Sequence, residues 1–300
     1  RTNSIFKHID MSSLTSSSSN ALPSHNTTIS TINTNLHNDN KTIDEYSLYL
    51  LNTLLEGCRS YQPPPIDTTS LTQGSPEWFK ARKSRLTGSN IAAAVGISPY
   101  ATSHSLYEKI TGKLGNNIFT SSSETRHGNH YEDYVVELYQ EITKRSVSET
   151  GFWIHPTVPW LGASPDGLIE DNGVLEIKCP LHKIHDTVPI YYMPQLQAEM
   201  ACTQRKYTDF CSWYYGGKSG TSKNKNKSGN ELKGRLRIIR VEFSTEYWDW
   251  LMNKMIRFWT CVQLDVSPRG VTELSKVSVK DIPVVKEVVL FDVETERPGV

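Results

Sequence analysis

A hairpin pattern over residues 164–179 constrains the fold of this chain more than any other feature. Two runs that contain apolar residues, 166–170 and 174–179, flank the turn sequence Asp171-Asn172-Gly173. An Asn-Gly pair between such runs is a strong signal for a β-hairpin. The segment therefore predicts two antiparallel strands, and the length of their loop decides which polar side chains meet.

Two loop lengths fit this pattern. A two-residue loop would put Asp166 and Glu176 on opposite faces of the hairpin. A three-residue loop, with Gly173 in the left-handed conformation, would set Leu168 opposite Glu176 and Asp166 opposite Lys178. Because side chains repeat every two residues along a strand, this second register brings Asp166, Glu176 and Lys178 to one face.

Two carboxylates and one ammonium on the same face have a definite chemical use. Neighbouring carboxylates repel each other unless a hard divalent cation, bound through their oxygens, neutralises them. Beside such a cation Lys178 can hold or polarise a water, which is the equipment for metal-assisted hydrolysis of a phosphodiester. The alternative, on spacing alone, is an exposed hairpin with a surface Glu–Lys pair.

The remainder of the chain divides by composition. Residues 1–44 are dominated by Ser, Thr and Asn, and such a segment buries too little apolar area to offset its ordering entropy, so we expect a disordered tail. Residues 45–72 predict a helix followed by the stiff connector Pro63-Pro64-Pro65. The low hydrophobic fraction of the whole chain, 37%, reflects this tail rather than a poor core.

Apolar periodicity predicts the remaining elements. We expect helices over about 76–85, 89–95, 127–145, 189–203 and 245–264, and strands over about 151–155, 158–163, 166–170, 174–179, 207–215 and 236–243. This order of helices, sheet strands, helix, strands and helix predicts a single α/β (α+β) domain.

Four blocks of sequence, in the same order, resemble the PD-(D/E)XK nuclease superfamily and, within it, the lambda-exonuclease-like branch of YqaJ-type viral recombinases. They are Trp78–Arg82 with Leu86–Ser89, His127–Glu132, Ser164–Gly167 with Leu175–Pro180, and Tyr192–Gln197. The resemblance implies a restriction-endonuclease-like core, with a central mixed β-sheet flanked by helices, over residues 73–265. Residues 266–300 would then be a C-terminal extension.

The resemblance assigns roles around the hairpin. It implies that Asp166 and Glu176, with the carbonyl of Ile177, bind Mg²⁺, for which Mn²⁺ would substitute. It implies that Lys178 positions the attacking water and that Glu132, on the long helix, supports the metal or the water. On composition alone, Glu132 would be an ordinary solvated helix residue.

A second group of residues resembles the family's site for a 5′-terminal phosphate: Arg82, Ser89, Ser164 and Gln195. An arginine fork matches phosphate oxygens, and Ser89 lies near an expected helix N-terminus, where free N–H groups favour anions. The resemblance therefore implies a Mg²⁺-dependent 5′-to-3′ exonuclease on double-stranded DNA ends, acting in recombination or end processing. A structure-specific or nicking endonuclease with the same metal site, and a non-catalytic DNA-end-binding protein, are the alternatives.

Charge refines the expected partners. The chain has 32 basic and 32 acidic residues, which argues against a bulk polyanion binder. Basic residues nevertheless gather in a Gly-, Ser- and Asn-rich loop over 216–234, where Lys223, Lys225 and Lys227 are candidates for contact with DNA phosphates. The resemblance adds a single-strand annealing protein and a homo-oligomer, such as a trimer, to the expected partners, and a viral or phage origin.

Cysteine use and hydropathy concern the compartment. The five cysteines form no Cys-x-x-Cys pair, which favours reduced thiols in an intracellular protein over disulfides or structural zinc. No run approaches the roughly 18 apolar residues of a membrane-spanning helix. We therefore expect no membrane association.

Overall fold

The computed structural model describes residues 67–113, 123–215, 234–270, 274 and 277–295. The predicted tail over 1–44, the helix and proline connector that follow it up to residue 66, and Lys223, Lys225 and Lys227 of the basic loop lie outside the described residues.

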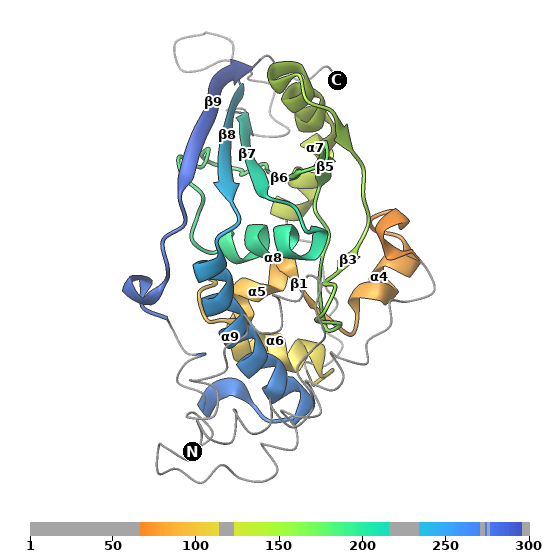
Figure 1. The fold of residues 1–300 in the computed structure, drawn as a ribbon, viewed down its shortest axis with the longest axis vertical. Coiled ribbons are helices and arrows are strands. Elements are labelled where there is room, and N and C mark those ends of the chain that lie inside the picture. Colours follow the sequence, from red (N-terminus) through yellow and green to blue (C-terminus); the bar gives the residue numbers. More distant parts are fainter. Residues whose placement is uncertain (1–66, 114–122, 216–233, 271–273, 275–276, 296–300) are drawn as a thin grey trace, which may run out of the picture.

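A six-stranded mixed sheet forms the centre of the fold (Figure 1), in the order β2-β5-β6-β7-β8-β9. Its strands are β2 (Val147–Ser148), β5 (Gly167–Ile169), β6 (Gly173–Lys178), β7 (Tyr207–Tyr215), β8 (Gly234–Glu242) and β9 (Glu287–Thr295). Strands β6 and β7 are parallel, whereas the other neighbours are antiparallel. The predicted α/β class with a central mixed sheet is confirmed. Strand β9, at one edge, comes from the segment that we expected to be a C-terminal extension.

A smaller sheet lies beside the first. It consists of β1 (Leu86–Thr87), β4 (Leu161–Ala163) and β3 (Trp153–Ile154), with β4 in the middle. Strand β4 ends one residue before Ser164, and β5 begins one residue after Asp166. The short link between the two sheets therefore carries two of the predicted site residues.

Most helices lie where the sequence predicts them, but their ends differ from the predicted ones by a few residues. The structure has α4 (Pro76–Arg82), α5 (Gly88–Ala94), α6 (Ser103–Ile110), α7 (Ser123–Thr143), α8 (Met193–Thr203) and α9 (Thr245–Gln263), with short 3₁₀ turns at Thr68–Ser70, Pro268–Gly270 and Val279–Asp281. Ser75 caps α4 by accepting from the Trp78 N–H, as Ser followed by Pro predicts. Helix α6 was not predicted.

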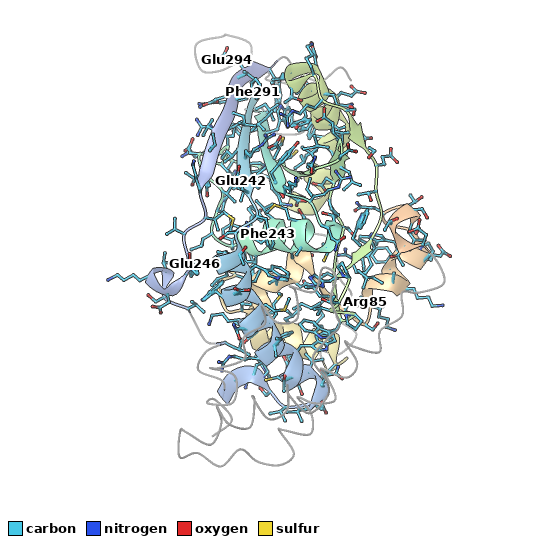
Figure 2. The ribbon with its side chains drawn as sticks, in the orientation of Figure 1. Arg85, Glu242, Phe243, Glu246, Phe291 and Glu294 are labelled. Carbon is cyan, nitrogen blue, oxygen red and sulfur yellow. The ribbon has the colours of Figure 1, made fainter. Side chains whose placement is uncertain are left out.

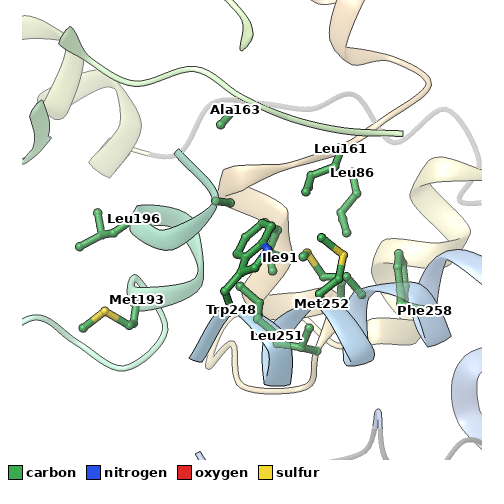
Figure 3. Packing of buried hydrophobic residues seen from close by; sticks show 14 of the residues in the cluster. Leu86, Ile91, Leu161, Ala163, Met193, Leu196, Trp248, Leu251, Met252 and Phe258 are labelled. Carbon is green, nitrogen blue, oxygen red and sulfur yellow. The ribbon is translucent and has the colours of Figure 1, made fainter. Parts of the chain in front are cut away.

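Two hydrophobic clusters cover the two faces of the main sheet. On one face, Val135 and Tyr139 of α7 pack on Leu175 and Ile177 of β6. On the other, Val174 belongs to the larger cluster that α5, α8 and α9 build, of which Figure 3 shows Leu196, Trp248 and other members. The alternation along β6 therefore sends Glu176 and Lys178 toward the α8 side.

Helix α8 is the crossover between the parallel strands β6 and β7, a connection that parallel pairing requires. Gln197 fixes α8 to the lower end of the sheet, because its side chain donates to the Glu242 carbonyl and accepts from the Ser244 N–H. Figure 2 shows Glu242 and Phe243 at this junction with α8. The first turn of α8 accommodates Pro194, where a missing N–H costs no helix hydrogen bond.

The hairpin has a three-residue loop, as one of the two predictions required, but the predicted pairing was wrong. Leu168 pairs with Val174, and not with Glu176, so the loop is Glu170-Asp171-Asn172. The left-handed residue is Glu170, with φ 45°, and not Gly173. The pairing is shifted by two residues, which keeps every side chain on its predicted face.

Contacts outside the hairpin explain this shift. Gly173 is drawn into β6, where it pairs with Tyr207 of β7, and a Cβ at Gly173 would contact the Tyr207 ring. The Arg205 guanidinium donates to the carbonyls of Ile169, Glu170 and Gly173 and holds the turn closed. Long-range pairing with β7 therefore sets the register that local turn preference alone predicted incorrectly.

Helices long and apolar enough to cross a membrane do not occur among the residues described.

Candidate active site

The structure brings together the predicted carboxylates and lysine at the end of the hairpin. The Ile177 N–H donates to Asp166 Oδ2 at 2.7 Å, which ties the residue before β5 to β6. Glu176 is 1% exposed, and its Oε1 accepts from Lys178 Nζ and, at 2.6 Å, from Gln195 Nε2. Glu176 Oε2 is buried and has no hydrogen-bond partner among the described residues.

Glu132 completes this cluster from the opposite side of the sheet. It lies on α7 one turn before Val135, whose side chain packs on the sheet, so i, i+3 spacing points both residues toward it. Burial raises the pKa of Glu132, and the negative charge of Glu176 raises it further, with Lys178 opposing. The charges of Glu176 and Lys178 thus act on Glu132, and its role at the site stays a prediction.

Several buried carboxylates repel one another in this cluster. Burial raises the pKa of Asp166 well above its ordinary value, and repulsion from Glu176 and Glu132 adds to this. Burial alone would lower the pKa of Lys178, but the carboxylates of Glu176 and Asp166 more than offset it and raise that pKa. Lys178 therefore stays an ammonium, and the site retains an unmet demand for positive charge.

The donor set fits a hard divalent cation on these grounds. Within the described ranges, no three His, Cys, Asp or Glu side chains converge closely enough to form a metal site by themselves. Mg²⁺ commonly binds through only one or two carboxylates and completes its octahedron with water and substrate phosphate. Asp166 and the unpartnered Oε2 of Glu176 provide such a pair.

The second predicted group forms around Ser164, two residues before Asp166. Ser164 Oγ accepts from Arg82 Nη1 at 3.0 Å and from Trp78 Nε1 at 2.9 Å. The Arg82 guanidinium lies 4.0 Å from the centroid of the Trp78 ring and 5.6 Å from that of Phe152. Burial lowers the pKa of Arg82 to about 10, so the guanidinium remains charged at neutral pH and is fixed on an aromatic bed.

Ser89 and Gln195, the other two residues of the predicted phosphate site, do not contact Arg82 or Ser164 through a hydrogen bond that the structure describes. Ser89 is exposed in the first turn of α5. Its neighbour Gly88 packs against Gln195, since a Cβ on Gly88 would lie 3.5 Å from Gln195 Cγ and 3.5 Å from the Cβ of Ala163. Gln195 itself donates to carboxylates, so in this structure it lies at the Glu176 cluster rather than at Arg82.

Two residues near the site were not predicted. Glu199 is fully buried and accepts from Gln195 Nε2 at 2.8 Å through Oε1, while its Oε2 has no partner in the part of the chain that the structure describes. The i, i+4 spacing of Gln195 and Glu199 on an expected helix was a signal available in the sequence. Tyr192 is the second, with its ring centroid 5.2 Å from Lys178 Nζ.

Solved structures share the fold of this chain. A solved alkaline exonuclease, LHK-Exo from Laribacter hongkongensis, superposes with a TM-score of 0.50 at 23% identity, over 64% of this chain and 94% of that chain. The same protein in complex with dAMP gives 0.50 at 24% identity, with the same coverage. These likenesses show the fold.

One relative and one family model match the sequence. An uncharacterized protein of Acanthamoeba polyphaga mimivirus is 28% identical over 158 residues, which are 46% of this chain and 28% of the mimivirus protein. The chain thus matches well under half the length of that relative. Residues 77–206, which include Arg82, the hairpin and α8, match the YqaJ-like viral recombinase domain. Over this segment the chain is similar to YqaJ-like viral recombinases.

Proposed function

We propose that this protein is a Mg²⁺-dependent exonuclease that digests one strand of double-stranded DNA from its 5′ end. The observation that carries the proposal is that the Arg82–Ser164 group and the carboxylate cluster lie next to each other in the sequence. Ser164, held by Arg82, lies only two residues before Asp166 of the carboxylate cluster. An anion-binding group and a candidate hydrolytic centre are therefore within roughly 7 Å along the backbone.

Each residue has a role that follows from its contacts. A Mg²⁺ ion held by Asp166, Glu176 and the Ile177 carbonyl would supply Lewis acidity at the scissile phosphate. Lys178, kept protonated by its carboxylate neighbours, orients the attacking water and offsets negative charge on the phosphate. Glu132, with its raised pKa, is suited to accept a proton from that water.

The Arg82 group supports the direction of digestion. A terminal phosphate monoester carries more negative charge than an internal diester, and a guanidinium fork binds its oxygens with two parallel hydrogen bonds. Arg82 is partly buried on Trp78, so this preference is exerted in a low dielectric. A strand that ends at this group would present its first phosphodiester to the carboxylates, and digestion would release mononucleotides.

The partners follow from this activity. Ends of double-stranded DNA are the substrate, and exposed single strands would pass to an annealing protein during recombination or end processing. Homo-oligomerisation would keep the enzyme on its DNA between steps.

A digestion assay on duplexes with 5′-phosphate or 5′-hydroxyl ends tests the proposal, with Mg²⁺ or EDTA present. We expect Mg²⁺-dependent release of mononucleotides, faster from the phosphorylated end. Asp166→Ala and Lys178→Ala should abolish digestion, whereas Asp171→Ala, which removes an exposed carboxylate from the same hairpin, should digest normally.

Three results would contradict the proposal. Undiminished activity of Asp166→Ala or Lys178→Ala would show that the chemistry lies elsewhere. Degradation of covalently closed circular DNA would favour a nicking endonuclease, and end binding without digestion under any metal would favour a non-catalytic protein.

A further inference from the structure

Three tyrosine rings form a continuous path from the candidate active site to the surface. The Tyr192 ring lies 5.2 Å from Lys178 Nζ, and its centroid is 4.6 Å from that of Tyr191. Tyr191 in turn meets Tyr100 edge to face, at 5.5 Å and an interplanar angle of 84°. The path links residues about ninety positions apart in the sequence, which come from the α5–α6 connection and from the two residues just before α8.

The outer ring of this path is exposed and yet held in place. Tyr100 is 74% exposed, the largest exposed fraction among the described aromatic side chains. Ser98 Oγ accepts from the N–H groups of Tyr100 and Ala101 at 3.2 and 3.3 Å, and the Tyr100 hydroxyl donates to that of Tyr191 at 3.4 Å. Immediately after it, Thr102 and Ser105 cap α6 reciprocally. These contacts fix the turn that presents Tyr100 to solvent.

Packing against the described residues does not explain this exposure. Large aromatic side chains contribute most of their stabilising free energy when they are buried. Among the rings that the structure describes, Tyr100 contacts that of Tyr191 alone, and an edge-to-face pair with one member 74% exposed leaves a π-face open. A fixed ring with an open face is what a planar ligand requires.

We propose that Tyr100 and Tyr191 form a stacking platform for an unpaired nucleobase of the strand that is being digested. The inference rests on the proposed function, because the continuity with Tyr192 and Lys178 is what identifies DNA as the occupant. Chemistry at a phosphodiester within a duplex end requires the bases near it to unstack, and an aromatic face beside the site replaces the lost stacking. Every base has a π-face, so the platform carries no sequence preference.

The platform predicts effects of a definite size and kind. One base–aromatic stack is worth roughly 1–3 kcal/mol, so its loss should weaken binding of single-stranded DNA by about 5- to 150-fold. Tyr100→Leu removes the π-face and retains apolar bulk, whereas Tyr100→Phe retains the ring and loses the hydroxyl. Because stacking neutralises no phosphate, the ratio of the two affinities should not change with salt.

The test uses the full chain in EDTA, which prevents digestion. The probe is a 5′-phosphorylated oligonucleotide, single-stranded over its first nucleotides, with 2-aminopurine placed at successive positions from the 5′ end. We expect the wild-type chain and Tyr100→Phe to bind with equal affinity and to quench 2-aminopurine at one or two positions. Tyr100→Leu should bind more weakly by the factor above and lose the quenching, with an unchanged unfolding temperature.

The outcomes separate this inference from the proposed function. If Tyr100→Leu binds and quenches as the wild-type chain does, or if the wild-type chain quenches at no position, the platform is wrong. The digestion assay then decides the proposed function independently. A protein that docks on Tyr100 in place of DNA would leave the quenching pattern unaffected by the substitution, which likewise overturns the inference.

Discussion

Replacing Arg82 with lysine should remove most of the preference for a 5′-phosphate while leaving the chemistry intact. Arg82 donates to Ser164 Oγ from Nη1 and lies 4.0 Å from the Trp78 centroid, so its orientation is fixed and its other donors remain available to the substrate. Lysine keeps the positive charge but offers a single ammonium in place of the fork.

The magnitude follows from what the lysine cannot do. One charge-assisted hydrogen bond contributes about 1.5–3 kcal/mol, so its loss should lower kcat/KM for the 5′-phosphorylated end by roughly 10- to 150-fold. Burial lowers the pKa of Arg82 from 12.5 to about 10. The same burial would lower the pKa of a lysine at this position below its ordinary value. The variant should therefore lose further phosphate preference at the alkaline end of the pH range, whereas the wild-type chain should not.

The assay compares initial rates on duplexes with 5′-phosphate and 5′-hydroxyl ends between pH 7 and 9. Arg85→Lys is the matched control, because Arg85 is three residues away and donates to the carbonyls of Pro159 and Ala81 rather than to Ser164. Loss of rate by the same factor on both ends would refute the assignment of Arg82 to the phosphate and point to a structural role. An unchanged phosphate preference in Arg82→Lys would refute it as well.

Three further predictions concern the metal and the fold. Mg²⁺ at 100 times its Kd should stabilise the chain by about 2.7 kcal/mol, measured as a higher unfolding temperature. EDTA and the substitution Glu176→Gln should each abolish this increase. An equal increase in Glu176→Gln would show that the ion binds elsewhere. Asp209→Asn should lower the free energy of unfolding, measured in denaturant, by about 3–5 kcal/mol. The reason is that buried Asp209 accepts from Arg240 Nε and Nη2 at 2.7 and 2.8 Å and from the Tyr139 hydroxyl. A decrease below about 1 kcal/mol would contradict this prediction. Burial lowers the pKa of His155 from 6.5 to about 4, so between these pH values the unfolded chain binds a proton that the folded chain does not. The free energy of unfolding should therefore fall by up to about 3 kcal/mol as the pH drops from 6.5 to 4. The variant His155→Gln should lack this dependence on pH.

How far the sequence predicts this molecule depends on the range of the interactions involved. Helices α4 and α9 follow from local signals, a serine cap with proline behind it and an apolar periodicity, and both were placed within three residues. The hairpin register was missed because its decisive contacts, those of Gly173 with Tyr207 and of Arg205 with the turn carbonyls, come from β7 and the end of α8. The local sequence of the hairpin does not contain these long-range contacts.

The edge strand β9 shows the same limit in another form. Its apolar residues alternate poorly, and Val288 and Val289 are both more than 40% exposed. The register with β8 shifts between Ile238 and Ile239, where Leu290 of β9 is left unpaired as a bulge, so no period of two appears in the sequence of β9. Strand β9 is recognisable only through its partner.

Gln195 is where family resemblance and geometry assign different tasks. The resemblance implies a phosphate ligand, but an amide has two hydrogens to donate, and both are directed at carboxylates: one at Glu176 Oε1 and one at Glu199 Oε1. The remaining polar atom of this side chain is an oxygen, which cannot donate to a phosphate. For Gln195 to bind the terminal phosphate, it must first leave Glu199, whose pKa is raised by burial and by the charge of Glu176. Glu199→Gln should therefore alter the 5′-phosphate preference if Gln195 binds phosphate. It should alter only the Mg²⁺ concentration needed for half-maximal activity if Gln195 serves to hold Glu176, and a titration of Mg²⁺ on both DNA ends distinguishes the two roles.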